Sequence, residues 1–515
     1  MSNKKFGKKL LAAAMATAMA ASMLAGCGDT KATTTPDSSA PAATTEGSAA
    51  ASTDAPKGDP VEIAIWRDSF NLNDPDDAHV NEVADAINEY IKDKINVKVT
   101  LTDIGNPEYP EKANLALGNG EINLLWTAHW TGAVRCDELY KQNACYDITD
   151  LIKGTALYET MPEWVWDASS YYGKNYFVPC YKEAAEGYNL MFRQDLVDKY
   201  GWDLSTVKSY KDIEPMLADC KAEGIKYPYL TQRTGLFYRW YMDSYDFFSQ
   251  DCLLAIDRAT DTVVNPAATA DYKEFNTIMC DWGQKGYISE DDATKTTPEA
   301  TTSTQDWGIS FWTDIPNNAS AEGRYGQKLA MVKVTEDWAH SNSTIGSCFA
   351  VTSACTEEQA KACVEFLELL YTDKALADLY TYGIEGVDYD RVDGKVQKKG
   401  DLYSHDPWDS CNQMCVSLTV SDPDNLAELY DDFNSNKAVV SQASGFRFDK
   451  SSIEAEYVAC TNVYNQFGYM LENGAYSPDE VDAKLAEYQA ALDEAGYQKI
   501  LAEAQSQYET WKSTK

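Results

Sequence analysis

The sequence predicts an α/β fold with two or three lobes. Strand and helix patterns alternate from residue 61 onward and begin in the order strand, helix, strand, helix, strand, which is typical of an α/β lobe. About 455 residues follow an N-terminal segment of low complexity, which is more than a single domain usually contains. The chain has no internal repeat that would favour another architecture.

The first strand is predicted at Val61–Trp66, where β-branched residues alternate with others. A helix is predicted next, between Val80 and Ile95, because apolar residues recur there at helical spacing. Asp76 and Asp77 precede this helix as candidate N-caps. Its apolar face consists of Val80, Val83, Ala84, Ile87, Tyr90, Ile91 and Ile95.

Three further elements complete this first unit. We expect a strand at Val97–Leu101, a helix at Glu111–Leu117 and a strand at Ile122–Trp126. The last strand is almost entirely apolar, as strands buried on both faces of a parallel sheet are.

The ends of these strands are candidate ligand positions. Ligands of open α/β sheets bind outside the carboxyl ends of the strands. Trp66 and Arg67 stand at the predicted end of the first strand, and His129 and Trp130 follow the third.

Two helices farther along carry N-terminal capping boxes. Thr356 and Gln359 precede a helix with apolar residues at Ala360, Cys363, Leu367 and Leu370. Ser477, Pro478 and Glu480 precede a second helix, which Gly496 interrupts. The apolar face of that helix consists of Val481, Leu485, Tyr488 and Leu492, and we expect the C-terminal segment as a whole to be helical.

The N-terminus, residues 1–26, has the pattern of an export signal. An apolar run of 16 residues, Leu10 to Ala25, follows four lysines and ends in Leu24-Ala25-Gly26-Cys27. The run is shorter than the roughly 18 apolar residues of a membrane-spanning helix, so we expect its removal. The ending resembles a bacterial lipoprotein signal, in which Cys27 receives a diacylglycerol thioether and anchors the chain by its acyl chains. The alternative is an ordinary secretory leader with a chance cysteine.

Residues 27–59 predict a lipidated cysteine followed by a tether. The linker consists of Ala, Thr, Ser, Pro, Gly and Asp, a composition that cannot bury a core. A flexible chain of this length reaches roughly 30 Å from a membrane.

The net charge of −37 limits the partners. Removal of the leader lysines leaves −41, a field that repels phosphate backbones and anionic membrane surfaces. We therefore expect no nucleic-acid partner, and a neutral or cationic ligand rather than a polyanion.

Twelve cysteines remain beside Cys27, and they are scattered along the chain. Their even number is compatible with disulfides in an exported protein, and buried thiols are the equal alternative. Zinc sites need clustered Cys and His, which the four histidines do not supply. Two acidic clusters, residues 74–79 and 388–393, do not fit the spacing of a calcium loop. We expect no metal and no cofactor.

Several motifs in order resemble one family, the extracellular solute-binding proteins of carbohydrate ABC transporters, which include maltose-binding protein. Residues 118–126, Gly-Asn-Gly-Glu-Ile-Asn-Leu-Leu-Trp, and the following Thr127–Trp130 resemble its Gly-x-x-Pro-Asp-Ile-Ile-Phe-Trp strand and ligand-contacting loop. Glu121 and Asn123 replace the usual Pro and Asp. Tyr176–Pro179 resembles the first crossover between lobes, and Asn189–Leu196 resembles the Leu-x-Tyr-Asn-Lys-Asp-Leu strand after it.

Later segments extend the resemblance over nearly all of the chain past residue 60. Gly346–Ala350, the capped helix and Leu369–Asp373 resemble the return crossing. Tyr382–Gly386 and Gly445–Trp511 resemble a large lipoprotein subgroup of gut-type Gram-positive bacteria.

The resemblance implies a two-lobed fold of the periplasmic-binding-protein type, with ligand in the interlobe cleft and a hinge near Val178–Tyr181. Lobe 1 is expected at 60–178 plus about 345–390, and lobe 2 at about 182–335 plus about 410–515. The implied function is capture of a small solute, foremost an oligosaccharide, outside the cell and delivery to an ABC permease. We expect a monomer, anchored by lipid to the outer face of the membrane, with no catalytic activity.

Candidate ligand contacts are aromatic and polar residues at the loops that the resemblance assigns to the cleft. A sugar ring has apolar faces and a hydroxyl rim, so it needs aromatic platforms and a few polar groups. The candidates are Trp66, Arg67, His129, Trp130, Glu183, Tyr238, Trp240, Trp312, Tyr382 and Glu385. The alternative is a packed core residue for each aromatic, a structural imidazole for His129, and a surface charge or ion pair for each charged residue.

Two other function classes remain as alternatives at this point. A surface glycosidase would use two carboxylates, and 81 Asp and Glu residues do not single out a pair. The chain lacks the common hydrolase, zinc-protease and P-loop motifs. A glycan-binding adhesin would bind insoluble polymers without closing around a short ligand. Within the binding-protein hypothesis, a peptide or an amino-sugar compound is the alternative ligand.

Overall fold

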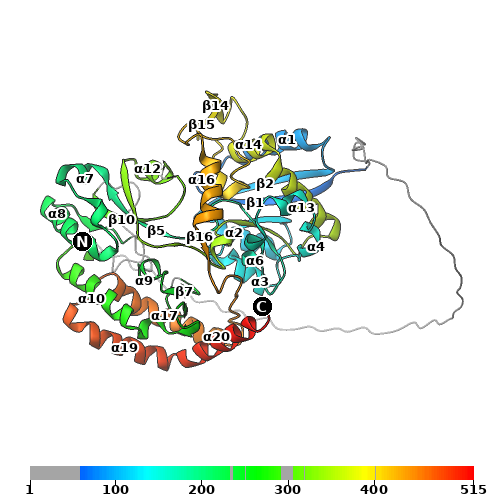
Figure 1. Cartoon of the computed structure of the whole chain (residues 1–515). Coiled ribbons are helices and arrows are strands. Elements are labelled where there is room, and N and C mark those ends of the chain that lie inside the picture. Colours follow the sequence, from blue (N-terminus) through cyan, green and yellow to red (C-terminus); the bar gives the residue numbers. More distant parts are fainter. Residues whose placement is uncertain (1–57, 232–235, 250, 291–305, 318, 401) are drawn as a thin grey trace, which may run out of the picture. The chain divides into compact units, whose positions relative to one another are not determined.

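The computed structural model describes residues 58–231, 236–249, 251–290, 306–317, 319–400 and 402–515. The leader, Cys27 and the linker up to residue 57 lie outside these ranges, so the predictions for them stay predictions. Two separate hydrophobic cores organise the described chain (Figure 1). We call lobe 1 residues 61–179 and 345–416, which surround the first core, and lobe 2 residues 188–333 and 443–512, which surround the second.

The sheet of lobe 1 has the strand order β2-β1-β3-β13-β4. The first three strands along the chain run parallel, and β13 lies antiparallel between β3 and β4. The strands are β1 (Val61–Ser69), β2 (Val97–Gly105), β3 (Leu124–Thr127), β4 (Phe177–Pro179) and β13 (Cys348–Val351). A hairpin of β14 (Tyr389–Val392) and β15 (Lys395–Lys398) belongs to the same lobe.

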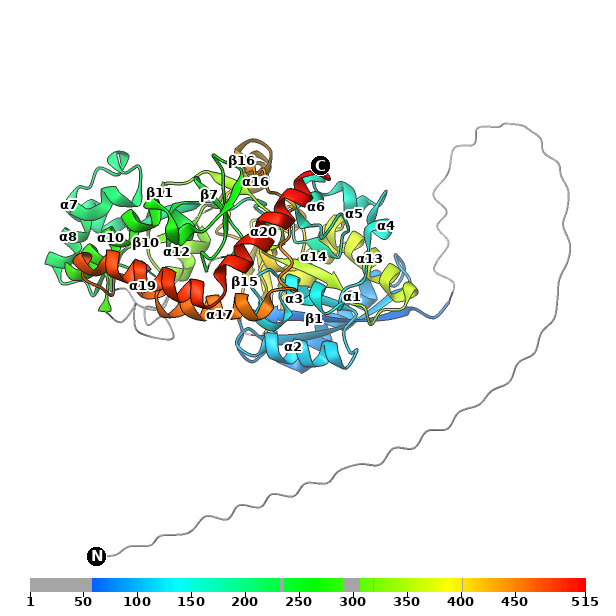
Figure 2. The ribbon, with the colours of Figure 1, turned by 90° about the horizontal axis from the view of Figure 1, so that it is seen from below.

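Helices cover both faces of this sheet. α1 (Asp77–Ile91) leads from β1 outward to β2, and α2 (Tyr109–Gly118) leads back across β1 to β3. Right-handed crossovers in opposite directions place the two helices on opposite faces, as Figure 2 shows. The other helices of lobe 1 are α3 (Cys136–Lys141), α4 (Thr149–Ile152), α5 (Ala156–Glu159), α6 (Glu163–Ser169), α13 (Glu357–Thr372), α14 (Lys374–Tyr382) and α15 (Pro407–Ser410).

The predicted elements of this lobe all form, with shifted ends. In α1 the predicted apolar face is the buried one, and the Asp76 side chain accepts from the backbone N–H of Ala78 and of His79. Ile87 and Ile91 are fully buried, which stabilises the helix by roughly 1.5–3 kcal/mol for each side chain. β1 continues three residues beyond its predicted end, to Ser69.

The main sheet of lobe 2 has the order β11-β5-β10-β6, in which β5 is antiparallel to both neighbours. A second, antiparallel sheet has the order β7-β8-β9. These strands are β5 (Tyr188–Arg193), β6 (Tyr227–Tyr229), β7 (Tyr245–Phe247), β8 (Ala255–Asp257), β9 (Thr262–Val264), β10 (Trp307–Thr313) and β11 (Leu329–Lys333). The helices of this part are α7 (Gln194–Tyr200), α8 (Glu214–Glu223), α9 (Leu236–Trp240), α10 (Ala270–Gln284) and α12 (Ala319–Tyr325).

The C-terminal helices complete lobe 2. They are α17 (Glu454–Gln466), α18 (Gly468–Glu472), α19 (Val481–Glu494) and α20 (Tyr497–Lys512). α18 and α19 pack against α10, beside which α19 runs in Figure 1. Both predicted capping boxes are confirmed, at Thr356 with Gln359 and at Ser477 with Glu480.

Three segments cross between the lobes, at residues 180–187, 334–344 and 417–442. The second contains β12 (Asp337–Ala339), which pairs in parallel with β16 (Ala438–Val440) of the third. α16 (Leu426–Asp432) precedes β16. Ala185, Ala339 and Phe433, one from each crossing, form a small core of their own. The three crossing segments therefore pack against one another rather than running separately between the lobes.

Two details differ from the sequence-based boundaries. Val178 lies in β4, so the first crossing begins only at Cys180. Cys411 and Val416 pack in the core of lobe 1, although the second lobe was expected to begin again at about residue 410. The segment after the β14–β15 hairpin thus belongs to lobe 1.

The cysteines are buried as thiols in most positions. Cys136, Cys363 and Cys411, for example, form no disulfide. The sulfur atoms of Cys136 and Cys348 lie 3.5 Å apart, well beyond the bond length of about 2 Å. The structure therefore corresponds to the thiol alternative of the sequence analysis.

Candidate functional site

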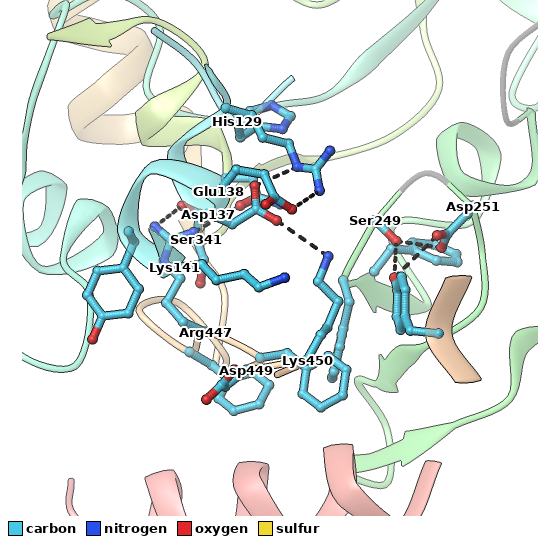
Figure 3. Close-up of a pocket in the computed structure, with 18 of the residues that line it drawn as sticks. His129, Asp137, Glu138, Lys141, Ser249, Asp251, Ser341, Arg447, Asp449 and Lys450 are labelled. Atoms are coloured by element: carbon cyan, nitrogen blue, oxygen red, sulfur yellow. Dashed lines mark hydrogen bonds and ion pairs between the residues drawn. The ribbon is translucent and has the colours of Figure 1, made fainter. Parts of the chain in front are cut away.

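A cavity of about 740 Å³ opens between the two lobes, within the usual size range of small-molecule sites (Figure 3). Lobe 1 contributes the loop after β3, helix α3 and a turn at residues 171–172. Lobe 2 contributes Tyr238, the β7–β8 region and residues 443–462, and the second crossing contributes residues 340–342. A ligand in this cavity would contact both lobes and one crossing at once.

Trp130 presents a fixed aromatic face in this cavity. Its residue is 44% exposed, which is unusual for so large an apolar side chain. The indole Nε1–H donates a hydrogen bond of 2.9 Å to the carbonyl of Gly346, and the ring centroid lies 5.9 Å from those of both Phe70 and Trp126. These contacts already fix the Trp130 ring. Stacking of a ligand on it therefore costs little side-chain entropy of Trp130.

His129 supplies an uncharged imidazole beside it. The backbone N–H of His129 donates to the carbonyl of Ile345, which fixes the loop against the turn that precedes β13. Burial lowers the pKa of the imidazole to about 4, so the ring is neutral at physiological pH. Among the described residues, none forms a hydrogen bond with the His129 ring. A neutral imidazole without a protein partner can both donate to and accept from ligand hydroxyls.

A buried carboxylate organises the floor of the cavity. Glu186, in the first crossing, accepts hydrogen bonds from Tyr238 at 2.7 Å, from His340 Nε2 at 2.9 Å and from Tyr188. The backbone N–H of Asn342 donates to His340 Nδ1, which assigns the proton of the ring to Nε2. Burial by itself would raise the pKa of Glu186, but these hydrogen bonds outweigh it and hold the pKa well below its ordinary value. The network joins two crossings to lobe 2 directly behind the ligand space.

Arg135, Lys141 and Lys450 in the cavity are already paired with carboxylates. Arg135 contacts Asp137 at 2.7 Å and Glu138 at 2.6 Å, and Lys450 lies 3.4 Å from Asp137. Lys141 and Glu454 form an ion pair. Figure 3 shows the contact between Lys450 and Asp137, with Glu138 next to Asp137.

Arg447 is held by neutral oxygens instead. Its guanidinium donates to the carbonyls of Ala168 at 2.7 Å and Ser341 at 2.6 Å, and to the Asn342 side chain at 2.9 Å. It also lies 4.4 Å above the centre of the Tyr171 ring. Each described cation of the cavity therefore already has protein oxygens as partners, and none needs an anionic ligand to satisfy its hydrogen bonds.

Aromatic side chains from both lobes line part of the remaining wall. The Tyr140 ring packs on those of Tyr171 and Tyr172, with centroids 5.0 and 5.5 Å away. On the other side, the Tyr457 hydroxyl lies 3.1 Å from Ser249 Oγ and 3.2 Å from Asp251 Oδ2. The other lining aromatics are Phe247, Phe248, Phe446 and Phe448. Flat apolar faces with scattered hydroxyl and imidazole groups can bind a ligand that has apolar faces and a polar rim.

Three of the ten predicted contacts, His129, Trp130 and Tyr238, line this cavity. Arg67 does not, because it is buried in a network with Asp103, Tyr380 and Tyr403.

The six other candidates also lie outside the cavity. Trp66 packs against the core of lobe 1, and the Tyr382 hydroxyl donates to the carbonyl of Ser417 inside it. Trp240 and Trp312 pack in the cores of lobe 2. Glu183 pairs with Lys182 at the first crossing, and Glu385 is an exposed partner of Arg391.

Sequence reasoning missed Tyr140, Tyr171, Tyr172, His340 and Arg447. The Tyr-Tyr-Gly sequence at 171–173 carried one usable signal, since a glycine after aromatic residues outside any strand or helix pattern suggests a turn. His340 and Arg447 carried none, because the oxygens they bind are remote in sequence. Within the described residues, no group of three His, Cys, Asp or Glu side chains is placed to hold a metal ion. No helix in that part of the chain is long and apolar enough to cross a membrane.

Comparisons with solved structures agree with this fold. The chain superposes on the N-glycan transport solute-binding protein of Streptococcus pneumoniae with a TM-score of 0.76 and 23% identity, over 88% of this chain and 100% of that one. An HMO-binding, ABC-transporter-associated solute-binding protein of Bifidobacterium longum infantis gives a TM-score of 0.58 with 16% identity, over 88% of this chain and 99% of the other. Both similarities concern the two-lobed fold.

Sequence comparisons point the same way. A carbohydrate ABC transporter substrate-binding protein of S. pneumoniae is 25% identical over 476 residues, which cover 87% of this chain and 91% of that protein. Residues 442–513, which include the C-terminal wall of the cavity, match a domain of unknown function, DUF3502. Residues 85–387 match the model of the bacterial extracellular solute-binding proteins, which are binding proteins rather than enzymes. The chain belongs to this family of bacterial extracellular solute-binding proteins.

Proposed function

We propose that the chain captures a neutral oligosaccharide in the interlobe cavity and delivers it to the permease of an ABC importer. The observation that carries the proposal is the lining of the cavity: aromatic faces come from both lobes, Arg135, Lys141 and Lys450 are paired with carboxylates, and Arg447 donates to neutral oxygens. Ligand contact with both lobes is what closure requires, because a ligand shifts an open–closed equilibrium only through its differential affinity for the two states.

The relatives support the chemical class. The N-glycan transport protein of S. pneumoniae was solved with Man1GlcNAc and with Man5GlcNAc, and the sequence relative from the same species is named as a carbohydrate ABC transporter substrate-binding protein. The composition of this cavity, in which Trp130, Tyr140 and Tyr172 are partly exposed, fits such ligands. Its paired cations favour them over phosphorylated or carboxylated sugars.

A thermal-shift screen tests the ligand class. The chain without its leader is mixed with neutral oligosaccharides, uronate-containing oligosaccharides and peptides, and we expect the melting temperature to rise only with the neutral glycans. Calorimetric titration of the hits then gives the affinity. Peptides that raise the melting temperature while glycans do not would replace this proposal with peptide transport, and shortened glycan products after incubation would replace it with catalysis.

We also propose that the chain acts as a monomer anchored by lipid on Cys27, since an apolar run ending in Leu24-Ala25-Gly26-Cys27 is the pattern of a lipoprotein signal. In cells, wild-type chain is expected in the membrane fraction and Cys27→Ser in the medium or as uncleaved precursor. Equal membrane retention of processed Cys27→Ser protein would refute the lipid anchor.

A further inference from the structure

A strained turn stands at the rim of the cavity. The backbone N–H of Tyr171 donates to the carbonyl of Lys174 at 2.9 Å, and the N–H of Lys174 donates back at 3.1 Å. Tyr172 and Gly173 therefore form a two-residue hairpin turn, with φ of +52° and +76°. Positive φ at both central positions is the property of type I′ turns, which favour Asn-Gly or Asp-Gly. Gly173 meets this geometry without cost, whereas a tyrosine in the left-handed region is strained.

The same chain contains a second turn of this geometry, which serves as an internal reference. The β14–β15 hairpin turns at Asp393 and Gly394, with φ of +51° and +83°. Asp393 does not line the cavity, and there the turn has the preferred Asp-Gly sequence. The tyrosine is thus not demanded by the turn itself.

Tyr172 does not contribute to a core either. Its residue is 54% exposed and lines the cavity. Its ring packs on Tyr140, and Tyr140 packs in turn on buried Tyr171, whose ring also contacts the guanidinium of Arg447. The exposed ring of Tyr172 is therefore supported by packed aromatic rings.

The hydroxyl of Tyr172 remains a hydrogen-bond donor. Partial desolvation of its phenol by the cavity wall, followed by the nearby carboxylate of Asp449, raises the pKa of Tyr172 to about 12. Asp449 lies on the lobe 2 side of the cavity, where Figure 3 labels it next to Lys450. The rim at Tyr172 is therefore approached by groups of both lobes.

Tyr172 and Trp130 form two separate aromatic faces. The ring contacts of Trp130 are with Phe70 and Trp126, and those of Tyr172 are with Tyr140. No ring contact joins the two faces within the described structure. One cavity thus offers two places at which a flat apolar ring can stack.

We infer that Tyr172, supported by Tyr140, is the stacking platform of an outer sugar subsite, used only by oligosaccharides long enough to extend beyond the platform at Trp130. The inference rests on the proposed function and deepens it, because it makes the chain a receptor for extended rather than short glycans. The strain at Tyr172 persists because ligand binding, rather than folding, requires an aromatic ring at this position.

The test uses Tyr172→Asn, which keeps the turn and removes the ring. The probes are a short and a long neutral oligosaccharide that bind the wild type, starting with Man1GlcNAc and Man5GlcNAc. We expect Tyr172→Asn to melt at the same temperature as the wild type or a higher one. It should bind the long probe roughly tenfold more weakly, because it loses one aromatic stacking contact of about 1.4 kcal/mol. Its affinity for the short probe should equal that of the wild type. Tyr172→Phe keeps the ring and is expected to retain most of the affinity for the long probe.

The matched control is Asp393→Tyr, which introduces a tyrosine into the reference turn. It is expected to lower the melting temperature and to leave both affinities unchanged. Equal affinities of wild type and Tyr172→Asn for the long probe, or a lower melting temperature with equal losses for both probes, would overturn the outer subsite alone. Failure of the wild type to bind any oligosaccharide would overturn the proposed function, and the subsite with it.

Discussion

The carboxyl ends of two neighbouring strands, β1 and β3, differ in whether a ligand can reach them. The sequence predicts ligand contacts after both, at Trp66 and Arg67 and at His129 and Trp130. The end of β3 opens into the cavity, whereas Arg67 is only 2% exposed. The general rule on open α/β sheets points to the edge at which the cavity lies, but it does not say which strand at that edge is accessible.

Two features explain the difference. β1 extends to Ser69, so Trp66 and Arg67 lie within the strand rather than after it. A distant segment also covers this end: Tyr403 accepts a hydrogen bond from Arg67 at 2.7 Å, and His405 contacts Asp103 at 2.9 Å. The charged pair at the end of β1 thus holds the fold together, while the exposed indole and neutral imidazole after β3 are free to meet a ligand.

The largest expected effect comes from Asp103→Ala, which leaves the Arg67 guanidinium buried without its bidentate partner. Removing one member of a buried pair costs about 3–5 kcal/mol in the free energy of unfolding, measured by urea titration. Burial alone would raise the pKa of Asp103, but Arg67 and His405 hold it at about 2, which indicates how strongly the carboxylate is held.

The control for this experiment is Glu357→Ala, which breaks the exposed pair with Lys361 on α13 and is expected to leave stability unchanged. Oligosaccharide affinity of folded Asp103→Ala protein is expected to stay at the wild-type value. A loss of affinity in this folded variant would mean that Arg67 contributes to ligand binding after all.

Trp130→Ala has the second largest expected effect, this time on binding. The loss of the exposed stacking face is expected to weaken oligosaccharide affinity by about 1.5–3 kcal/mol, roughly 10- to 100-fold in calorimetric titration, with an unchanged melting temperature. Trp66→Ala is the matched variant on β1. It is expected to lower the melting temperature and leave affinity intact. Weaker binding by Trp66→Ala at an unchanged melting temperature would contradict the difference proposed between the two strand ends.

The smallest expected effect is the pH dependence contributed by His129. Its pKa falls from an ordinary 6.5 to about 4 in the folded chain, so the unfolded chain binds the proton more tightly. The stability contribution of His129 is therefore full above about pH 6.5 and is lost as the pH falls toward about 4. One pKa unit corresponds to about 1.4 kcal/mol, and solvent in the cavity reduces the effect to the order of 1–2 kcal/mol.

The readout is the free energy of unfolding against pH for the wild type and His129→Gln, whose difference should shrink between pH 6.5 and 4. His79→Gln is the opposite control. Burial lowers the pKa of His79, but hydrogen bonds with Glu82 and Asp388 raise it overall, so its contribution is lost as the pH rises. Parallel curves for wild type and His129→Gln would mean that the imidazole after β3 is not buried as a neutral group.

The regular elements of lobe 1 could be predicted because their signals are local. The apolar spacing from Val80 to Ile91 and the carboxylate of Asp76 are close enough in sequence to specify a helix and its start. The same holds for the capping box at Thr356 and Gln359. The site was less predictable, since two of its predicted residues, Glu183 and Glu385, pair with Lys182 and Arg391 outside the cavity.

The sequence by itself determined the alternation of strands and helices, the acidic character of the chain and the resemblance to solute-binding proteins, because periodicity, charge and motifs are properties of short segments. Only the tertiary structure decided which aromatic and charged residues meet the ligand space. Tyr172 and Tyr382 are the same residue type, yet one is 54% exposed at the cavity and the other 2% exposed in a core. Exposure depends on which distant segments pack over a side chain, and no local pattern encodes that packing.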